Sequence, residues 1–430
     1  MRVLITNNTL AARAGSELYV RDLATALLDR GITPIAYSTQ LGEVAEELRR
    51  ATVPVIDNLD ALATPPDLIH GQHHLETMTA LLRFPGVPAI YVCHGWLPWE
   101  EMPPRFPRIL RYIAVDHTCR DRLVCEHAIP EDRLRLLLNF VDLERFKPRG
   151  ALPARPARAL VFSNYASEQT YVQAARSACQ RAGIALDVIG LNAGKACAHP
   201  EAVLGRYDLV FAKARSALEG LAVGAAVVLC DAAGVGEMVT TANLDRLRPL
   251  NFGIRALREA VSVEALAREI ARYDAGDAGE VSRRIRATAG RDAAIDEIVS
   301  LYQEVIAENA GQPHDALAEY RAASAYLRAQ APRLKERDGL WIAYQAMQKE
   351  REHLHTERDR IEAEREALRA GLAASNERVG IQDQQLFATQ AELERMRNTL
   401  GWRLLSHYGP IKHRFVLPAY HRIKKLLKAE

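Results

Sequence analysis

The chain lacks the features that mark several large protein classes. Its 430 residues include six cysteines, none in a C-x-x-C pair, and the formal net charge is only +2. The cysteine spacing excludes a zinc-finger or disulfide scaffold, and the near-neutral charge argues against a nucleic-acid-binding protein. No window reaches the roughly 18 apolar residues that span a bilayer, so any membrane contact is expected to be peripheral. The start, MRVLITNN, reads as a buried strand and not as a signal peptide, which predicts a cytoplasmic protein.

Two nucleotide-binding motifs are also missing. No G-x-G-x-x-G follows the first apolar strand, which argues against a nicotinamide enzyme. The segment GLNAGKA (190–196) is one residue short of a phosphate loop and lacks the following serine or threonine. We therefore expect no bound cofactor and no P-loop chemistry.

What is present is a regular alternation of apolar strands and amphipathic helices over residues 1–310, which predicts parallel sheets covered on both faces. The run KPRGALPARPAR (147–158) interrupts the rhythm with three prolines and suits a linker. The sequence thus predicts two consecutive Rossmann-like α/β domains, 1–148 and 159–310. A helix near 292–308 either closes the second domain or crosses back to the first.

After residue 310 the strand signals vanish and helix formers dominate. Apolar residues recur every seven positions, at d positions in the first half of this region and at a positions in the second. The d series is Leu340, Met347, Leu354, Ile361 and Leu368, and the a series is Leu372, Val379, Leu386, Leu393 and Leu400. The complementary a positions are Tyr344, Arg351, Arg358 and Arg365, and the complementary d positions are Ser375, Gln382, Thr389 and Met396. Each half has one apolar stripe, which predicts a long helical or coiled-coil region over 313–400 that either forms a homodimer through 340–400 or stays solvated or partner-dependent.

The last thirty residues, 401–430, are basic and aromatic. They hold seven Lys or Arg residues against one Glu, with Trp402, Tyr408, Phe415 and Tyr420 between them. This mixture is typical of an amphipathic segment on an anionic membrane surface. A protein contact is the second interpretation, and nucleic acid is the third.

Residues 207–239 carry the most informative local pattern. An apolar strand, Leu209–Phe211, runs into a short polar loop, and a helix is expected to open at Ser216 before a second apolar strand. The N-terminus of such a helix directs free backbone N–H groups at one place, which suits a phosphate or diphosphate. Lys213 and Arg215 flank the loop and would offset the charge of a departing diphosphate. The plain alternative is two solvated loop charges.

Glu219 has two competing interpretations. One turn inside the predicted helix, its carboxylate is placed to hold a ribose hydroxyl pair beside the phosphate site. Ser216 and Glu219 also form the S-x-x-E pattern of a capping box, which by itself would explain both residues. Since the carboxylate has room for one main partner, the ribose and the cap exclude each other.

Histidines follow two other predicted strands. His94 comes directly after the strand Ala89–Cys93, at the end where open α/β sheets bind ligands. Its alternative is a ring satisfied by a loop carbonyl. His70, His73 and His74 form an HxxHH cluster, but no carboxylate or cysteine at useful spacing completes a metal site. We interpret this cluster as cleft lining and predict no metal.

Five segments, in order, resemble the GT-B-fold glycosyltransferases of family 4 (group 1). They are AGSELYVRDLATALLDRG (14–31), PDLIHGQHH (66–74), VCHGW (92–96), LNFVDLERFKP (138–148) and ALEGLAVGAAVV (217–228). The resemblance covers roughly residues 1–310. It implies a GT-B fold, a nucleotide-diphosphate-sugar donor, and a glycan or lipid-linked acceptor in surface polysaccharide biosynthesis. It also implies retention of anomeric configuration without a metal, and the absence of an Asp-x-Asp motif agrees.

The resemblance also implies roles for particular residues. Gly15 and Ser16 lie in the loop over the donor diphosphate and acceptor, His94 reaches the donor sugar, and Glu219 binds the nucleotide ribose. Asn164 and Tyr165 are candidates to line the nucleotide site. With the basic tail, these roles describe a cytoplasmic enzyme at the inner face of the plasma membrane.

The chain departs from the family pattern at two places. The family's first glutamate, eight residues before Glu219, is Phe211 here, and the segment VFSNYASEQT (161–170) lacks the usual diphosphate-binding Arg and Lys. Lys213 or Arg215 is expected to substitute as the catalytic cation. Two other interpretations stay open, an inactive scaffold that acts through 313–430 and a nucleotide-sugar epimerase.

Overall fold

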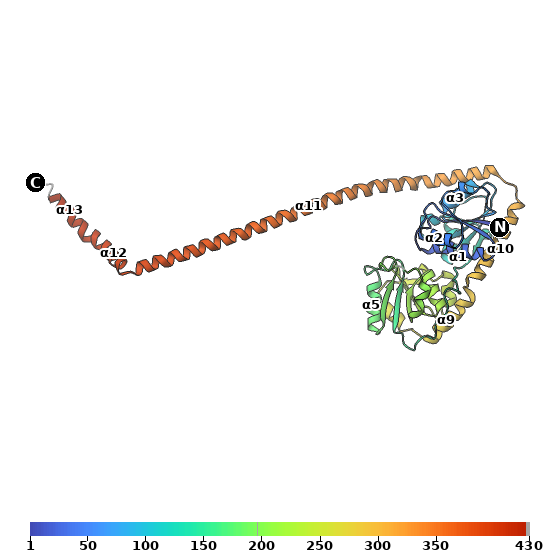
Figure 1. The fold of residues 1–430 in the computed structure, drawn as a ribbon, viewed down its shortest axis with the longest axis horizontal. Coiled ribbons are helices and arrows are strands. Elements are labelled where there is room, and N and C mark those ends of the chain that lie inside the picture. Colours follow the sequence, from blue (N-terminus) through green and yellow to red (C-terminus); the bar gives the residue numbers. More distant parts are fainter. Residues whose placement is uncertain (196, 427–430) are drawn as a thin grey trace. The chain divides into compact units, whose positions relative to one another are not determined.

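The structure is a computed structural model that describes residues 1–195 and 197–426 (Figure 1). The chain divides into two compact units, of which the first is Met1–Ala329 and the second begins at Gln330. Over the described residues, no helix combines the length and the apolar composition that crossing a membrane requires.

The first sheet has seven strands in the order β3-β2-β1-β4-β5-β6-β7, and every neighbouring pair is parallel. Its strands are β1 (Arg2–Thr6), β2 (Thr33–Tyr37), β3 (Val55–Ile56), β4 (Leu68–Gln72), β5 (Ala89–Cys93), β6 (Ile109–Ala114) and β7 (Leu134–Leu136). The accompanying helices are α1 (Gly15–Leu28), α2 (Glu43–Arg50), α3 (His74–Arg83) and α4 (His117–Asp121). Strand β5 is wholly apolar, as expected where helices cover both faces of a parallel sheet, but the central strand β4 also holds the buried His70 and Gln72.

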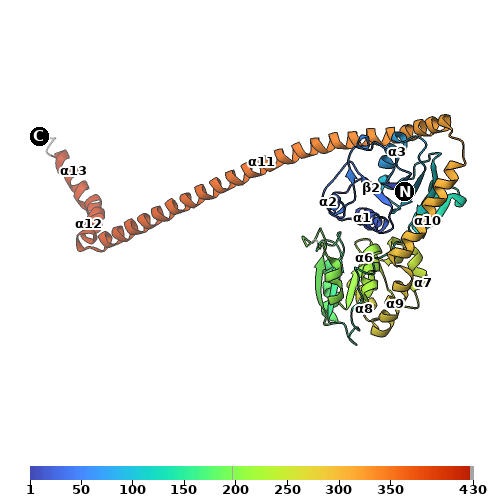
Figure 2. The same cartoon turned by 45° about the vertical axis from the view of Figure 1, so that its right-hand side comes forward.

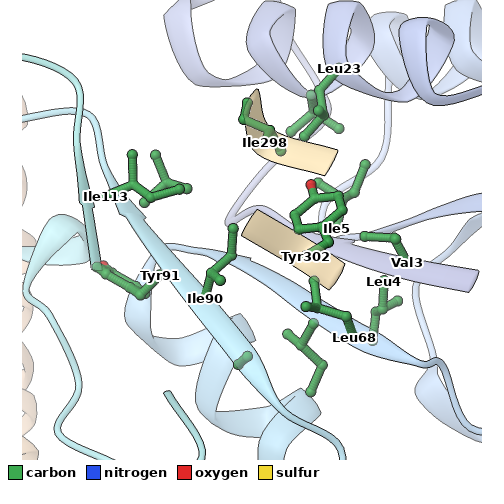
Figure 3. Close-up of a cluster of buried hydrophobic side chains, with 14 of the residues drawn as sticks. Val3, Leu4, Ile5, Leu23, Leu68, Ile90, Tyr91, Ile113, Ile298 and Tyr302 are labelled. Carbon is green, nitrogen blue, oxygen red and sulfur yellow. The ribbon is translucent and has the colours of Figure 1, made fainter. Parts of the chain in front are cut away.

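A helix from much later in the chain completes the first core. Ile298 and Tyr302 of α10 (Arg291–Ala310) lie among Val3, Ile5 and Leu23 (Figure 3). The apolar positions of α10 recur every three or four residues and so form one buried face. Of the two predicted placements of this helix, the structure shows the one that crosses back to the first domain.

The second sheet has six strands in the order β13-β12-β11-β10-β8-β9. The pairs from β11 to β9 are parallel, and β12 and β13 add an antiparallel edge. The strands are β8 (Arg158–Phe162), β9 (Ala185–Ile189), β10 (Leu209–Ala212), β11 (Ala226–Asp231), β12 (Gly234–Met238) and β13 (Leu257–Glu259). The helices are α5 (Val172–Arg181), α6 (Ala214–Val223), α7 (Leu244–Leu247), α8 (Val263–Ile270) and α9 (Ala275–Thr288). The predicted pair of α/β sheets is confirmed.

The C-terminal region is helical, as predicted. A single helix, α11 (Ala316–Asn398), runs for 83 residues. Its first turns belong to the first unit, where Glu319 pairs with Arg108 at 2.8 Å. Beyond it lie α12 (Leu400–Ile411), a π-helical segment (Lys412–Val416) and α13 (Leu417–Leu426). Coiled-coil pairing of α11 stays a prediction.

Candidate functional site

Among the described residues, several buried side-chain polar atoms at the carboxyl edge of the first sheet lack a hydrogen-bond partner. The strands β1, β4 and β5 are neighbours there, and Asn7, Gln72 and His94 stand at or directly after their ends. Asn7 Oδ1, both amide atoms of Gln72 and His94 Nε2 are buried without a hydrogen-bond partner. Each such atom costs about 1–3 kcal/mol when it is left unsatisfied. This edge therefore presents the polar atoms that a ligand or bound water would satisfy.

His94 is held by its main chain and keeps its ring for other contacts. Its backbone N–H donates to Glu101 Oε2 at 2.9 Å. The ring lies edge-on to Tyr19, with 4.5 Å between ring centroids. Burial lowers the pKa of His94 to about 4, so the imidazole is neutral near pH 7. A neutral ring can offer a substrate a hydrogen bond but no positive charge.

The three histidines of the HxxHH cluster have separate partners. His70 Nδ1 lies 2.6 Å from the Tyr302 hydroxyl, and His74 Nδ1 lies 2.7 Å from that of Tyr326. His73 accepts from the Asn8 backbone N–H at 3.1 Å, and its φ of +59° is rare for a residue with a side chain. Within the described part of the chain, no group of three or more possible ligands is arranged around a metal position. Strained backbone of this kind concentrates at functional sites, which makes His73 the cluster member of most interest.

His70 makes folding stability depend on pH. Burial lowers its pKa to about 3, against about 6.5 in the unfolded chain. Below pH 6.5 the unfolded chain therefore binds a proton on this histidine that the folded protein does not bind. As a result, the free energy of unfolding falls as the pH drops toward 3. For one such group, the free energy of unfolding changes by at most about 1.4 kcal/mol per pH unit.

We expect His70→Gln to flatten this slope between pH 6 and pH 4.5 by about 1 kcal/mol per pH unit, measured by urea denaturation. His94 contributes in the same direction, so part of the slope remains. His353→Gln removes an exposed histidine of α11 and controls for the substitution itself. Equal slopes for the wild type and His70→Gln would contradict a neutral, buried His70.

The second domain supplies the N-terminus of α6, and here one expectation is wrong. The helix begins at Ala214 with Lys213 as its N-cap, not at Ser216. Ala214 enters the helix with a φ of +49°, and its N–H donates to the Phe252 carbonyl at 2.9 Å. Ser216 is therefore inside the first turn, and the Ser216–Glu219 capping box does not form. In the described chain, the N–H groups of Arg215 and Ser216 have no acceptor, so the open helix end that suits an anion is present.

Arg215 joins the two domains. Its guanidinium pairs with Glu219 on the same helix at 2.9 Å and with Asp22 of α1, to which Arg21 also donates at 2.6 Å. Figure 2 shows α1 and α6 facing each other where the domains meet. Burial raises the pKa of Glu219 although Arg215 opposes it. Burial also acts to raise the pKa of Asp22, but Arg215 and Arg21 bring it below its usual value.

The other predicted donor-site residues lie at the carboxyl edge of the second sheet. Lys213 forms an ion pair with Asp231 at the end of β11, and its Nζ lies 5.9 Å from the centre of the exposed Tyr165 ring. Asn164 donates from Nδ2 to the Arg13 carbonyl of the first domain at 3.3 Å. Both predicted cations, Lys213 and Arg215, thus already have carboxylate partners.

Gly15 and Ser16 form the first turn of α1. A Cβ added to Gly15 would meet nothing within 4 Å, so packing within the protein does not require glycine there. The Ser16 hydroxyl donates to Glu17 at 2.9 Å. The absence of an internal constraint leaves room above this turn for a ligand.

Sequence reasoning missed the carboxylates that hold the site together. Asp22, Glu101 and Asp231 position Arg215, the His94 loop and Lys213 respectively. Asp22 stands in an ordinary amphipathic helix, 193 residues before its partner. No local pattern marks such a pair, because the contact exists only after the two domains meet.

Comparisons with known proteins agree with this architecture. Residues 13–145 match the model of Glycosyltransferase Family 4. The fold is similar to a glycosyltransferase from Rickettsia africae ESF-5, with 14% identity, a TM-score of 0.52, and coverage of 71% of this chain and 98% of that one. It is also similar to Alr3699/HepE of Anabaena in complex with UDP and glucose, with 14% identity, a TM-score of 0.50, and coverage of 71% and 100%. No curated protein matches the chain.

The comparisons identify the fold of the chain and the family that its N-terminal part resembles. The chain has the GT-B fold of glycosyltransferases, and its N-terminal part is similar to family 4, so the predicted resemblance is confirmed. Together the family match and the fold support a glycosyltransferase. The predicted roles of single residues stay predictions.

Proposed function

We propose that this protein transfers a sugar from a nucleoside-diphosphate donor to a glycan or lipid-linked acceptor. The carrying observation is the open N-terminus of α6 with Lys213 and Arg215, placed at the carboxyl edge of one sheet and joined across the domains to α1 of the other. Anabaena HepE, which has this fold, is described with UDP and glucose bound, and that supports the donor class.

The chemistry follows from where charge develops. As the bond between the sugar C1 and the phosphate oxygen breaks, negative charge grows on the diphosphate. The free amides of α6 and the cations Lys213 and Arg215 stabilise that charge, and Asp231 and Asp22 hold the two cations in place beforehand. Since these cations are already paired, the incoming diphosphate either shares them with the carboxylates or displaces the carboxylates.

The first domain supplies the opposite wall of the site. His94, neutral near pH 7 and with an unsatisfied Nε2, donates to or accepts from a sugar hydroxyl.

In the second domain, Glu219 keeps one carboxylate oxygen beyond its bond to Arg215 for a ribose hydroxyl. Closure of the two domains over the donor excludes water that would otherwise hydrolyse it. Retention of configuration and independence of metal are part of the proposal.

The test is a thermal-shift screen of nucleoside diphosphates and their sugars, followed by transfer assays on those that bind. A ligand at 100 times its Kd stabilises the folded state by about 2.7 kcal/mol, a readily measured shift. An inactive scaffold binds none of them, and that result overturns the proposal. A nucleotide-sugar epimerase converts the donor to its isomer without acceptor, which product analysis reveals.

We further propose that the enzyme works at the cytoplasmic face of a membrane in surface polysaccharide biosynthesis. The described tail residues 401–426 keep Tyr408, Phe415 and Tyr420 at least half exposed beside exposed lysines and arginines. Trp402 lies in this stretch, but its side chain is outside the described part, as are residues 427–430. Exposed aromatics among cations suit an anionic lipid surface.

Deleting residues 401–430 is expected to abolish flotation with vesicles that contain phosphatidylserine. Each basic residue near such a surface contributes about 1 kcal/mol, so Lys424→Gln with Lys425→Gln should weaken binding roughly thirtyfold. Vesicles of neutral phosphatidylcholine provide the lipid control. Unchanged flotation after the deletion would contradict the membrane role.

A further inference from the structure

The heptad positions of α11 hold an unpartnered seam. Between Tyr344 and Met396 its ten apolar a and d residues are each 46–75% exposed, although such residues normally pack against a partner helix. The other six seam positions are polar and also exposed. The polar ones are Arg351, Arg358 and Arg365 at a, and Ser375, Gln382 and Thr389 at d.

The arrangement of these residues distinguishes the two ways of pairing two copies. In a parallel pair, each a position faces the same a of the partner and each d faces d. Arg351, Arg358 and Arg365 would then each face their own copy, which places three like-charge layers in the seam. In an antiparallel pair, a faces d, so no arginine faces an arginine.

In one antiparallel register, every layer pairs two apolar residues or two polar residues. In this register each residue of one helix faces the residue of the second copy whose number brings the sum to 740, so that the apolar d residues of the first half meet the apolar a residues of the second. The apolar layers are Leu368–Leu372, Ile361–Val379, Leu354–Leu386, Met347–Leu393 and Tyr344–Met396. The polar layers are Arg365–Ser375, Arg358–Gln382 and Arg351–Thr389. The seam is therefore complementary to its own reverse, which a helix that binds an unrelated partner does not require.

We propose that α11 pairs with α11 of a second copy of this chain as an antiparallel coiled coil centred on residue 370. The matched layers run over residues 344–396, about 80 Å of helix at 1.5 Å per residue. Gly371, next to the centre, lacks a side chain where the two helices cross their symmetry axis. Residues outside the seam do not decide the orientation. At the flanking g positions, whose numbers add up to 742 in this register, Glu364 lies beside Arg378 of the partner, but Glu350 lies beside Glu392. The layers themselves carry the argument.

The first test introduces one negative charge into the seam. In the antiparallel register, Gln382→Glu faces Arg358 of the partner twice per dimer and should tighten dimerisation about fivefold, measured by sedimentation equilibrium of the full chain. In a parallel pair the same glutamate faces itself and weakens dimerisation. Gln384→Glu makes the same charge change at an outward heptad position and should leave the dissociation constant unchanged.

The second test is geometric. A disulfide needs Cα atoms about 4.4–6.8 Å apart. Position 358 faces 382 in the antiparallel pair and lies about 36 Å from its own copy, at 1.5 Å for each of 24 residues. Mild oxidation of mixed Arg358→Cys and Gln382→Cys chains, tagged to differ in size, should give only the mixed cross-linked dimer. The wild-type chain under the same oxidation controls for the exposed Cys125.

Three results would overturn the proposal. They are a monomer at all concentrations, weaker dimerisation of Gln382→Glu, and same-site cross-links of Arg358→Cys. None of these readouts depends on sugar transfer, so the pairing can fail while the proposed enzyme activity stands, and the reverse also holds.

Discussion

Arg215→Met is expected to lower the free energy of unfolding by about 3–5 kcal/mol and to abolish sugar transfer. The substitution leaves Asp22 and Glu219 as two buried carboxylates without their shared cation. Urea denaturation of the full chain measures the first effect, and a transfer assay measures the second. Arg246→Met removes a half-exposed arginine paired with Glu237 and should change stability by less than about 1 kcal/mol. Equal effects of the two substitutions would contradict the structural role of Arg215.

A triple variant separates stability from donor binding. Adding Asp22→Asn and Glu219→Gln to Arg215→Met removes the uncompensated charges and should recover most of the lost stability. If Arg215 also binds the diphosphate, donor affinity stays low in this variant. Recovery of both properties would show that Arg215 only joins the domains.

Glu219→Gln is expected to weaken donor binding about 10- to 100-fold, since a hydrogen bond to a charged group contributes about 1.5–3 kcal/mol. The amide keeps the size of the side chain and can still accept from Arg215, so the fold should persist. Calorimetry with the nucleotide that gives the largest thermal shift measures the effect. The KM for the donor should rise more than kcat falls, because the ribose contact is the same in the ground state and the transition state.

Glu269→Gln is the matched control for this prediction. Glu269 is also buried and paired with an arginine, Arg272 at 2.9 Å, but it lies on α8 and not at the candidate site. Its substitution should leave donor affinity unchanged. The same affinity in wild type and Glu219→Gln would leave Glu219 with only its contact to Arg215.

The strand pattern located much of the candidate site in advance. An apolar strand followed by a histidine placed His94 at the carboxyl edge of the first sheet, and the pattern around Leu209–Phe211 placed Lys213 and Arg215 at the carboxyl edge of the second. These positions follow from local periodicity, which one stretch of sequence contains. The expected helix start at Ser216 was wrong, because α6 begins two residues earlier, at Ala214, with Lys213 as its N-cap. Ala214 has a φ of +49°, a backbone conformation that alanine rarely adopts and that the sequence therefore does not indicate.

By itself, the sequence determined the two α/β sheets, the long helix with its heptads and the strand ends where the candidate site lies, because each depends on the spacing of apolar residues along one segment. Tertiary structure alone decided that α10 packs on the first sheet and that Asp22 meets Arg215. Both are contacts between segments far apart in the chain. These contacts are stabilised by burial and charge pairing that exist only once the domains have come together. No pattern within a single segment therefore indicates them.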